Sequence, residues 1–166
     1  MASVKLEYAA SSAVTITLAA LASDANLLAG RESTLIDNSV NKYLDYLLAG
    51  KIMTGTSPTT AKQISVYVAG LMDDTTWPDV LDGTDSAETI SSAGNRDSCL
   101  KLAAVIPTIA TSDFAYYFGP ISVAALFGGT LPKKFVVFVV HNTAVNLNAT
   151  PGNHVISITP VYETIA

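Results

Sequence analysis

The sequence contains little cysteine, little charge and no long uninterrupted apolar run. Cys99 is the only cysteine among 166 residues, which excludes an internal disulfide and any zinc site built from several cysteines. No run approaches the roughly 18 apolar residues that a membrane-spanning helix needs. The first residues include acidic and aromatic side chains where a signal peptide would have an apolar segment. We therefore expect a protein that is made in the cytosol and has no membrane partner.

Charged residues make up only 14% of the chain, below the quarter that is typical of soluble domains. Nine basic against fourteen acidic residues give a formal net charge of -5. This balance lacks the basic surface that binds a nucleic-acid backbone, so no nucleic-acid partner is predicted. Low charge combined with many small polar residues suits a β-rich surface that other protein partly covers, and it indicates assembly.

The sequence also lacks a recognisable catalytic arrangement. His141 and His154 are the only histidines, and each stands beside an asparagine at the end of a predicted strand. No acid–serine–histidine or cysteine–histidine spacing can be proposed around them, and two histidines without a third ligand make a weak metal site. No glycine-rich loop leads into a helix with the lysine of a phosphate cradle. We therefore predict no catalytic residue, no bound metal and no cofactor.

The most apolar stretch of the chain is residues 134–142. β-Branched and aromatic side chains dominate it, and it is too short to cross a bilayer. This pattern predicts a strand that is buried on both faces in the middle of a sheet. A strand with two covered faces needs a second layer, which we expect to be another sheet.

Seven further segments have strand patterns, bounded by turn residues at fairly regular spacing. The expected strands are residues 14–18, 31–37, 42–53, 64–68, 100–106, 114–123, 134–142 and 155–159. Segment 42–53 also fits a helical stripe that ends at Gly50, but we favour a strand. Residues 122–127 predict one short helical turn, with Ser122 as its cap.

These elements predict an all-β fold, an antiparallel eight-stranded jelly-roll sandwich with one short helical turn. An immunoglobulin-like sandwich is the alternative, weakened because no cysteine pair brackets a core tryptophan. Residues 13–166 would form this single domain, with a long loop at 73–99.

Residues 1–12 are expected to form an extended N-terminal arm. Val4, Leu6 and Tyr8 alternate with polar residues, which is the pattern of a strand that adds to an open sheet edge. The arm has too little apolar surface to fold alone, because ordering each residue costs about 1–2 kcal/mol of backbone entropy. We therefore expect it to pack on another subunit, an adjacent copy of the chain.

The long loop gathers acidic residues around Trp77 and a following proline. Its acidic residues are Asp73, Asp74, Asp79, Asp82, Asp85 and Glu88. No register starting at Asp73, Asp74 or Asp79 supplies the ligand spacing of a calcium-binding EF-hand loop. We expect a solvated acidic loop pinned by Trp77, which prefers a partly buried site or a protein contact. Trp77 and Asp79, together with Tyr116 and Tyr117 of the aromatic strand, are therefore candidate contact residues.

Several turn and strand segments resemble a known family. The residues that carry the resemblance are 29–33, 37–38, 55–59, 64–68 and 118–120, within a similarity that extends from about residue 13 to residue 163. They look like the jelly-roll decoration (cement) proteins of tailed-bacteriophage heads. The resemblance implies a virion protein on the outer surface of the capsid, made in the host bacterial cytoplasm, commonly a homotrimer. It also implies that the protein stabilises the capsid by bridging major capsid protein subunits.

Two other functions remain open from the sequence. A carbohydrate- or receptor-binding β-sandwich module of a phage tail or fibre is the main alternative, because Trp77, Tyr116, Tyr117 and the acidic loop offer aromatic and polar contacts. A hydrolase would draw its paired carboxylates from the loop, with Asp79 and Asp82 as candidates, but no sequence feature fixes the separation that such chemistry needs.

Overall fold

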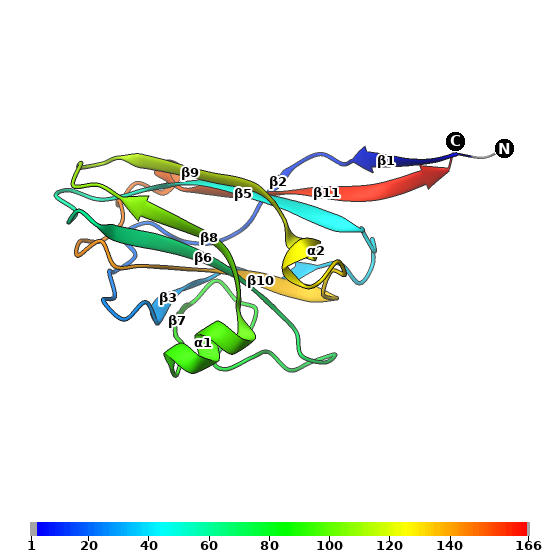
Figure 1. Cartoon of the computed structure of the whole chain (residues 1–166), viewed down its shortest axis with the longest axis horizontal. Coiled ribbons are helices and arrows are strands. Elements are labelled where there is room, and N and C mark those ends of the chain that lie inside the picture. The colour runs from blue at the N-terminus through cyan, green and yellow to red at the C-terminus, as the bar shows by residue number, and fades with distance from the viewer. Residues whose placement is uncertain (1–2, 166) are drawn as a thin grey trace.

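The computed structural model describes residues 3–165 as a sandwich of two antiparallel β-sheets (Figure 1). Strands make up 44% and helices 9% of the chain, which confirms the predicted all-β sandwich class. The strand count is wrong, because the described residues form eleven strands rather than eight. Within this part of the chain, no helix is long and apolar enough to cross a membrane.

Each sheet is built from strands that lie far apart in the sequence. In the first sheet the order is β1-β11-β5-β9, with β2 also paired to β11. Its strands are β1 (Val4–Tyr8), β2 (Ser12–Ala13), β5 (Asp45–Met53), β9 (Ala115–Ser122) and β11 (Val155–Ile165). In the second sheet the order is β7-β3-β10-β6-β8, with β4 also paired to β10. Its strands are β3 (Ala29–Glu32), β4 (Ile36–Asp37), β6 (Lys62–Gly70), β7 (Ala87–Thr89), β8 (Lys101–Thr108) and β10 (Lys134–His141).

Strand β10 lies in the middle of the second sheet, as its apolar sequence predicts. Phe135, Val137 and Val139 point into the core between the sheets, together with buried side chains of both sheets. The alternate residues, Val136 among them, join a second apolar cluster on the outer face of the same sheet. The other sheet covers only the inner face, and the segment between β6 and β8, with helix α1 (Ala93–Cys99), covers the outer face (Figure 1).

The predicted strand at residues 14–18 is wrong. Val14 and Leu18 are buried in the core, but the segment forms no strand. The Val14 N–H donates to the Ile156 carbonyl in the first sheet, whereas the Thr15 carbonyl accepts from the Thr34 N–H between β3 and β4. The chain crosses here from one sheet to the other. The alternation of apolar and polar residues therefore reflects which side chains are buried, and no strand ladder forms along this segment.

The predicted strand at 31–37 is divided into β3 and β4. Ser33 follows β3 and forms two hydrogen bonds with Val137, both at 2.9 Å. The Ser33 N–H donates to the Val137 carbonyl, and the side-chain oxygen Ser33 Oγ accepts from the Val137 N–H. A side-chain oxygen therefore replaces a backbone acceptor, and the regular ladder is interrupted.

The strand at 42–53 is confirmed as β5, so its helical alternative is wrong. The short helical turn is confirmed as α2 (Val123–Leu126), and Ser122 Oγ accepts from the Ala125 N–H at 3.0 Å. Helix α1 and the 3-10 turn η1 (Pro151–Asn153) were not predicted. The polar sequence of α1 has no apolar stripe, and none of its residues is buried.

Candidate interaction surfaces

The first candidate surface is a two-stranded ribbon formed by β1 and the end of β11. Antiparallel pairing runs from Val4 opposite Ile165 to Tyr8 opposite Val161. Strand β5 accompanies β11 only as far as Val161. We call β1 and residues 161–165 the ribbon, and Figure 1 shows it extending away from the sandwich body. Its apolar side chains are exposed: 63% for Val4, 57% for Leu6, 61% for Tyr8 and 79% for Ile165.

The two faces of the ribbon differ in chemistry. Residues opposite one another in an antiparallel pair share a face, so Val4, Leu6, Tyr8 and Ile165 lie on one side, which also carries Glu163 opposite Leu6. The other side carries Lys5 and Glu7 together with their partners on β11. There the Glu7 carboxylate accepts hydrogen bonds from the hydroxyls of Thr164 (3.0 Å) and Tyr162 (3.4 Å). The ribbon therefore presents a mainly apolar face, on which Glu163 is the charged residue, and a hydrogen-bonded polar face.

The alternating arm sequence does form a strand, but the expected partner differs. We expected residues 1–12 to add to a neighbouring copy, whereas β1 pairs with strand β11 of its own chain. The first two residues of the arm lie outside the described residues. Among residues 3–165, no strand pairs with the other edge of β1, and all five of its side chains are exposed.

Tyr117 and Tyr116 occupy opposite faces of β9. Tyr117 is 74% exposed on the outer face of the first sheet. Tyr116 is buried in the core, where its hydroxyl accepts from the Ile109 N–H at 2.9 Å and its ring packs edge-on against Phe114. Neighbouring residues of a strand point to opposite faces, so only one of the two tyrosines is accessible. The side chain of Tyr116, which we expected to contact a partner, is therefore inaccessible in the folded chain.

Trp77 is half-buried on the outer face of the second sheet, where it packs against the apolar cluster of Tyr67, Leu81 and Phe138. Gly83 lies over its ring with a φ of +81°, and a Cβ there would come within 3.0 Å of the indole. A side chain at position 83 would both strain the backbone and displace the tryptophan. Trp77 therefore pins the long segment to the sheet, as its sequence context indicates.

Asp79 uses its carboxylate within the segment. The carboxylate accepts from Ser91 Oγ at 2.7 Å and from Asn95 Nδ2 at 2.9 Å, which joins the segment to the first turn of α1. Partial burial acts to raise the pKa of Asp79, but these hydrogen bonds hold it below its ordinary value. The hydrogen bonds explain a structural role for this residue.

The other acidic side chains of the segment also have partners in the chain. Asp73 accepts from Thr75 and Thr76, Asp74 pairs with Lys133, Asp82 accepts from Thr84, and Asp85 pairs with Arg31 and Thr17. Among residues 3–165, no group of three or more His, Cys, Asp or Glu side chains is placed to hold a metal ion. The segment, which we expected to be a solvated loop, covers the sheet and directs several of its carboxylates to local donors.

One buried carboxyl group, that of Glu32, was not predicted from the sequence. Glu32 is fully buried at the end of β3, and its carboxylate accepts from the backbone N–H groups of Gly83 (2.7 Å) and Asp82 (3.2 Å). Burial raises the pKa of Glu32 to about 7, against the effect of these two donors. The local sequence does not distinguish Glu32 from an exposed strand residue, because its burial depends on a segment about fifty residues away.

Both histidines are satisfied inside the fold. His141 is fully buried, with Nε2 3.0 Å from the Leu21 carbonyl and Nδ1 3.0 Å from Thr143 Oγ1. His154 has Nε2 2.8 Å from the Asn148 carbonyl. Burial lowers the pKa of each imidazole. These contacts favour neutral, structural histidines.

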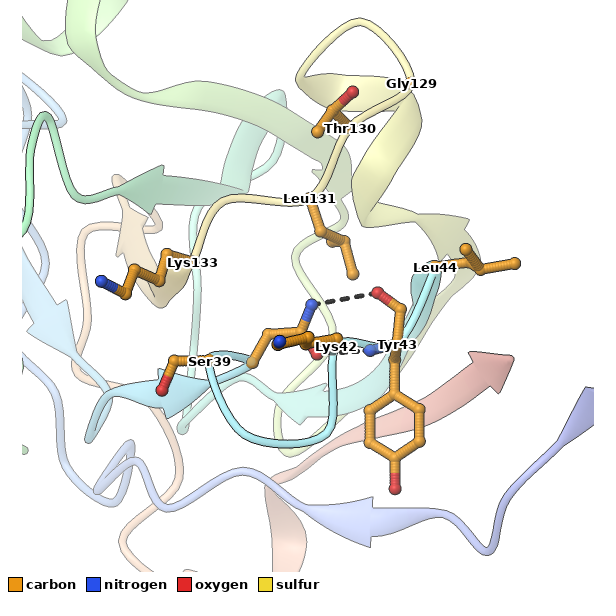
Figure 2. Close-up of a pocket in the computed structure, with 9 residues that line it drawn as sticks. Ser39, Lys42, Tyr43, Leu44, Gly129, Thr130, Leu131 and Lys133 are labelled. Atoms are coloured by element: carbon orange, nitrogen blue, oxygen red, sulfur yellow. Dashed lines mark hydrogen bonds between the residues drawn. The ribbon is translucent and has the colours of Figure 1, made fainter. Parts of the chain in front are cut away.

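A hollow of about 540 Å³ lies between two loops, residues 38–44 and 129–133 (Figure 2). The buried Asn38 side chain holds the first loop, because it donates to the Tyr43 carbonyl (3.0 Å) and accepts from the Tyr43 N–H (2.8 Å). Lys42 and Lys133 line the hollow, and Lys133 also pairs with Asp74 at 2.6 Å. The loops are about ninety residues apart in sequence, so sequence patterns alone do not bring them together.

The predicted contact residues thus belong to three separate surfaces: the ribbon, the outer face of the first sheet at Tyr117, and the covering segment at Trp77 and Asp79. Comparison with known proteins adds no identity, since no family model matches the chain and no curated protein is significantly similar to it.

Proposed function

We propose that the chain is a virion structural protein that binds the outer surface of a tailed-phage head and bridges major capsid protein subunits. The observation that carries this proposal is the ribbon, whose apolar face is exposed although the sandwich has a complete core of its own. An exposed row of large apolar side chains on a projecting element is typical of a surface that another protein covers. The expected homotrimer, and the absence of a catalytic role, belong to the same proposal.

We also propose that the sandwich is a jelly roll. We treat β1 and β7 as additions to an eight-stranded sandwich and count β3 and β4 as one strand. The remaining strands, numbered 1 to 8 in chain order, are β2, β3/β4, β5, β6, β8, β9, β10 and β11. In this numbering the first sheet has the order 1-8-3-6 and the second the order 2-7-4-5. Two interlocked Greek keys give this arrangement, and the jelly roll recurs in viral capsid domains. An immunoglobulin-like sandwich places its first two strands in one sheet, whereas β2 and β3 lie in different sheets.

Binding to phage heads tests the function directly. Purified protein is mixed with assembled heads that lack it, and the bound protein is measured by co-sedimentation. We expect saturable binding that stabilises the heads against heat. The double substitution Val4→Asp and Leu6→Asp should weaken binding. Val40→Asp, at an 82% exposed apolar position outside the three candidate surfaces, serves as the control. Heads that bind neither the natural chain nor the control would overturn the capsid assignment.

A carbohydrate- or receptor-binding module remains the second candidate, and the hollow in Figure 2 is the observation that favours it. Clefts of roughly 300–1,000 Å³ are typical of small-ligand sites. The hollow is lined by Lys42, Ser39 and Thr130, whose ammonium and hydroxyl groups would suit an acidic or hydroxyl-rich ligand. Glycan binding that is lost in Lys42→Ala, in a protein that does not bind heads, would favour this candidate.

A further inference from the structure

The outer edge of β1 is a row of unpaired backbone groups. In the described chain β1 is the last strand of its sheet, with β11 on one side and no strand on the other. The Ala9 N–H donates to the Pro160 carbonyl at 3.0 Å, which fixes the phase of the ladder. Along an antiparallel strand, residues whose backbone groups bond to the neighbouring strand alternate with residues whose groups point away from it. Since Ala9 bonds to β11, Glu7 and Lys5 also direct their backbone groups toward β11. The N–H and C=O groups of Val4, Leu6 and Tyr8 therefore point outward.

The ribbon lacks the support that such a structure needs in water. A two-stranded hairpin is only marginally stable, whereas three or more strands with an apolar face are stable. An open strand edge is also a template for pairing with another chain. The outward row on β1 contains three residues, while the opposite edge of the ribbon, beyond Val161 on β11, offers only Glu163 and Ile165. Strand β1 is therefore the better edge for an added strand.

The sequence of β1 is complementary to itself. When Val-Lys-Leu-Glu-Tyr is placed antiparallel to a second copy and centred on Leu6, Lys5 lies opposite Glu7 and Val4 lies opposite Tyr8. In this register the outward N–H and C=O groups of Val4, Leu6 and Tyr8 face the same groups of the other copy. Each of the three facing pairs can exchange two backbone hydrogen bonds, which gives six in total. Registers shifted by two residues pair fewer positions and lose both opposite-charge pairs. The backbone phase and the charges thus select the same register.

We propose that two copies of this chain associate edge to edge, β1 against β1, about a two-fold axis at Leu6. The contact joins two ribbons into a four-stranded sheet. Lys5, which makes no ion pair among the described residues, then pairs with Glu7 of the other copy at two places. The apolar side chains of the two β1 strands then lie side by side on one face of this sheet. Figure 1 shows the ribbon clear of the sandwich body, which leaves space for the second copy.

This contact differs from the expected trimer and does not depend on the capsid assignment. A trimer requires a three-fold contact, whereas a pair of ribbons has two-fold symmetry. On a head, the ribbons would connect chains that belong to neighbouring trimers. In solution, the two-fold contact is measurable on the purified protein alone, so its failure is distinguishable from a failure to bind heads.

Charge exchange tests the register. Lys5→Glu places two acidic residues opposite one another at both pairs, and Glu7→Lys places two lysines there. We expect each single variant to self-associate about tenfold more weakly than the natural chain, because like charges directly opposite destabilise a sheet. The exchanged variant, with Lys5→Glu and Glu7→Lys together, should associate more tightly than Glu7→Lys alone. An equimolar mixture of the two single variants should associate more tightly than either variant alone, because in the mixed pair every acidic residue faces a lysine.

Sedimentation velocity over a range of concentrations provides the measurement, and circular dichroism melting verifies that each variant is folded. The exchanged variant loses the same Glu7 hydrogen bonds as Glu7→Lys, so comparing the two isolates the charge pairing. Natural protein that shows no association through β1, or folded single variants whose mixture associates no better than either alone, would overturn the proposal.

Discussion

At the scale of single residues, Glu32 is the side chain whose environment departs most from expectation. It is a fully buried carboxyl group whose two donors are backbone N–H groups of a distant segment. No Arg, Lys or His side chain forms an ion pair with it among the described residues. Burial without a cation favours the protonated acid, which is why the pKa rises to about 7.

Glu32 should make the stability of the fold depend on pH. Its carboxyl group has an ordinary pKa of 4.5, and in the folded chain the pKa is about 7. Between pH 4.5 and about 7 the folded state binds a proton that the unfolded state has released. The protonated Glu32 therefore makes its full contribution to the free energy of unfolding below about pH 4.5, and this contribution is lost as pH rises through about 7. A shift of one unit corresponds to about 1.4 kcal/mol, so the total loss is up to about 3 kcal/mol.

Urea unfolding of the natural chain and of Glu32→Gln, from about pH 5 to pH 8, measures this effect. His141 and His154 have lowered pKa values and act in the opposite direction over part of this range. Both proteins contain them, so the difference between the two unfolding free energies isolates Glu32. We expect the natural chain to lose stability relative to Glu32→Gln as pH rises. A difference that is constant, or that changes with the opposite sign, would show that the two N–H donors outweigh burial.

Val137→Asp is predicted to be the most damaging single substitution. Val137 is fully buried in the central strand and packs in the core between the sheets. An unpaired ion there costs several kcal/mol against a total domain stability of about 5–15 kcal/mol. Thermal melting followed by circular dichroism should show loss of the cooperative transition, with Tyr117→Asp as an exposed control. A soluble Val137→Asp protein with a near-normal midpoint would contradict the central position of β10.

At the scale of elements, the segment between β6 and β8 acts as a cover for the second sheet. Leu81, Ile90 and Leu100 are buried against the outer side chains of β6 and β10. Arg96 of α1 stacks over the Tyr67 ring at 5.9 Å and donates to the Leu27 carbonyl at 3.1 Å. These contacts attach α1 to the sheet without burying any helix residue.

Ile90→Ala should therefore destabilise the whole domain and not only a loop. Ile90 is 1% exposed, and truncating such a side chain to alanine typically costs about 2–5 kcal/mol. Chemical denaturation should show this loss in a single transition. Val80→Ala, in the same segment but exposed, should change the midpoint little. A separate early transition for Ile90→Ala would mean that the segment unfolds independently of the sandwich.

The same elements explain how far the sequence predicts this fold. Strands with many apolar or alternating residues, such as β10, β6 and β5, are predicted because their patterns reflect their own two faces. Residues 14–18 have the same alternation but cross between sheets, and sequence periodicity does not distinguish pairing from burial. The burial of Glu32 and the hollow beside Asn38 depend on segments distant in sequence, so neither was predicted.

At the scale of the whole molecule, the domain consists of a self-sufficient sandwich and a ribbon that contributes little to its core. All five residues of β1 are exposed, while the core between the sheets is formed by the remainder of the chain. The stability of the sandwich and the association of the chain should therefore be separable. We therefore expect the sandwich body to fold without β1 and without residues 162–165 of β11.

Removal of residues 3–8 tests this separation. The melting midpoint of the sandwich should change little, because the deletion removes no buried side chain. Amide hydrogen exchange of residues 162–165 should become faster, since β1 is their strand partner and β5 ends its pairing at Val161. Self-association and attachment to heads should both weaken. Val40→Asp, at an exposed position away from the ribbon, is the control. Unchanged association together with a collapsed sandwich would show that the arm belongs to the core of its own chain.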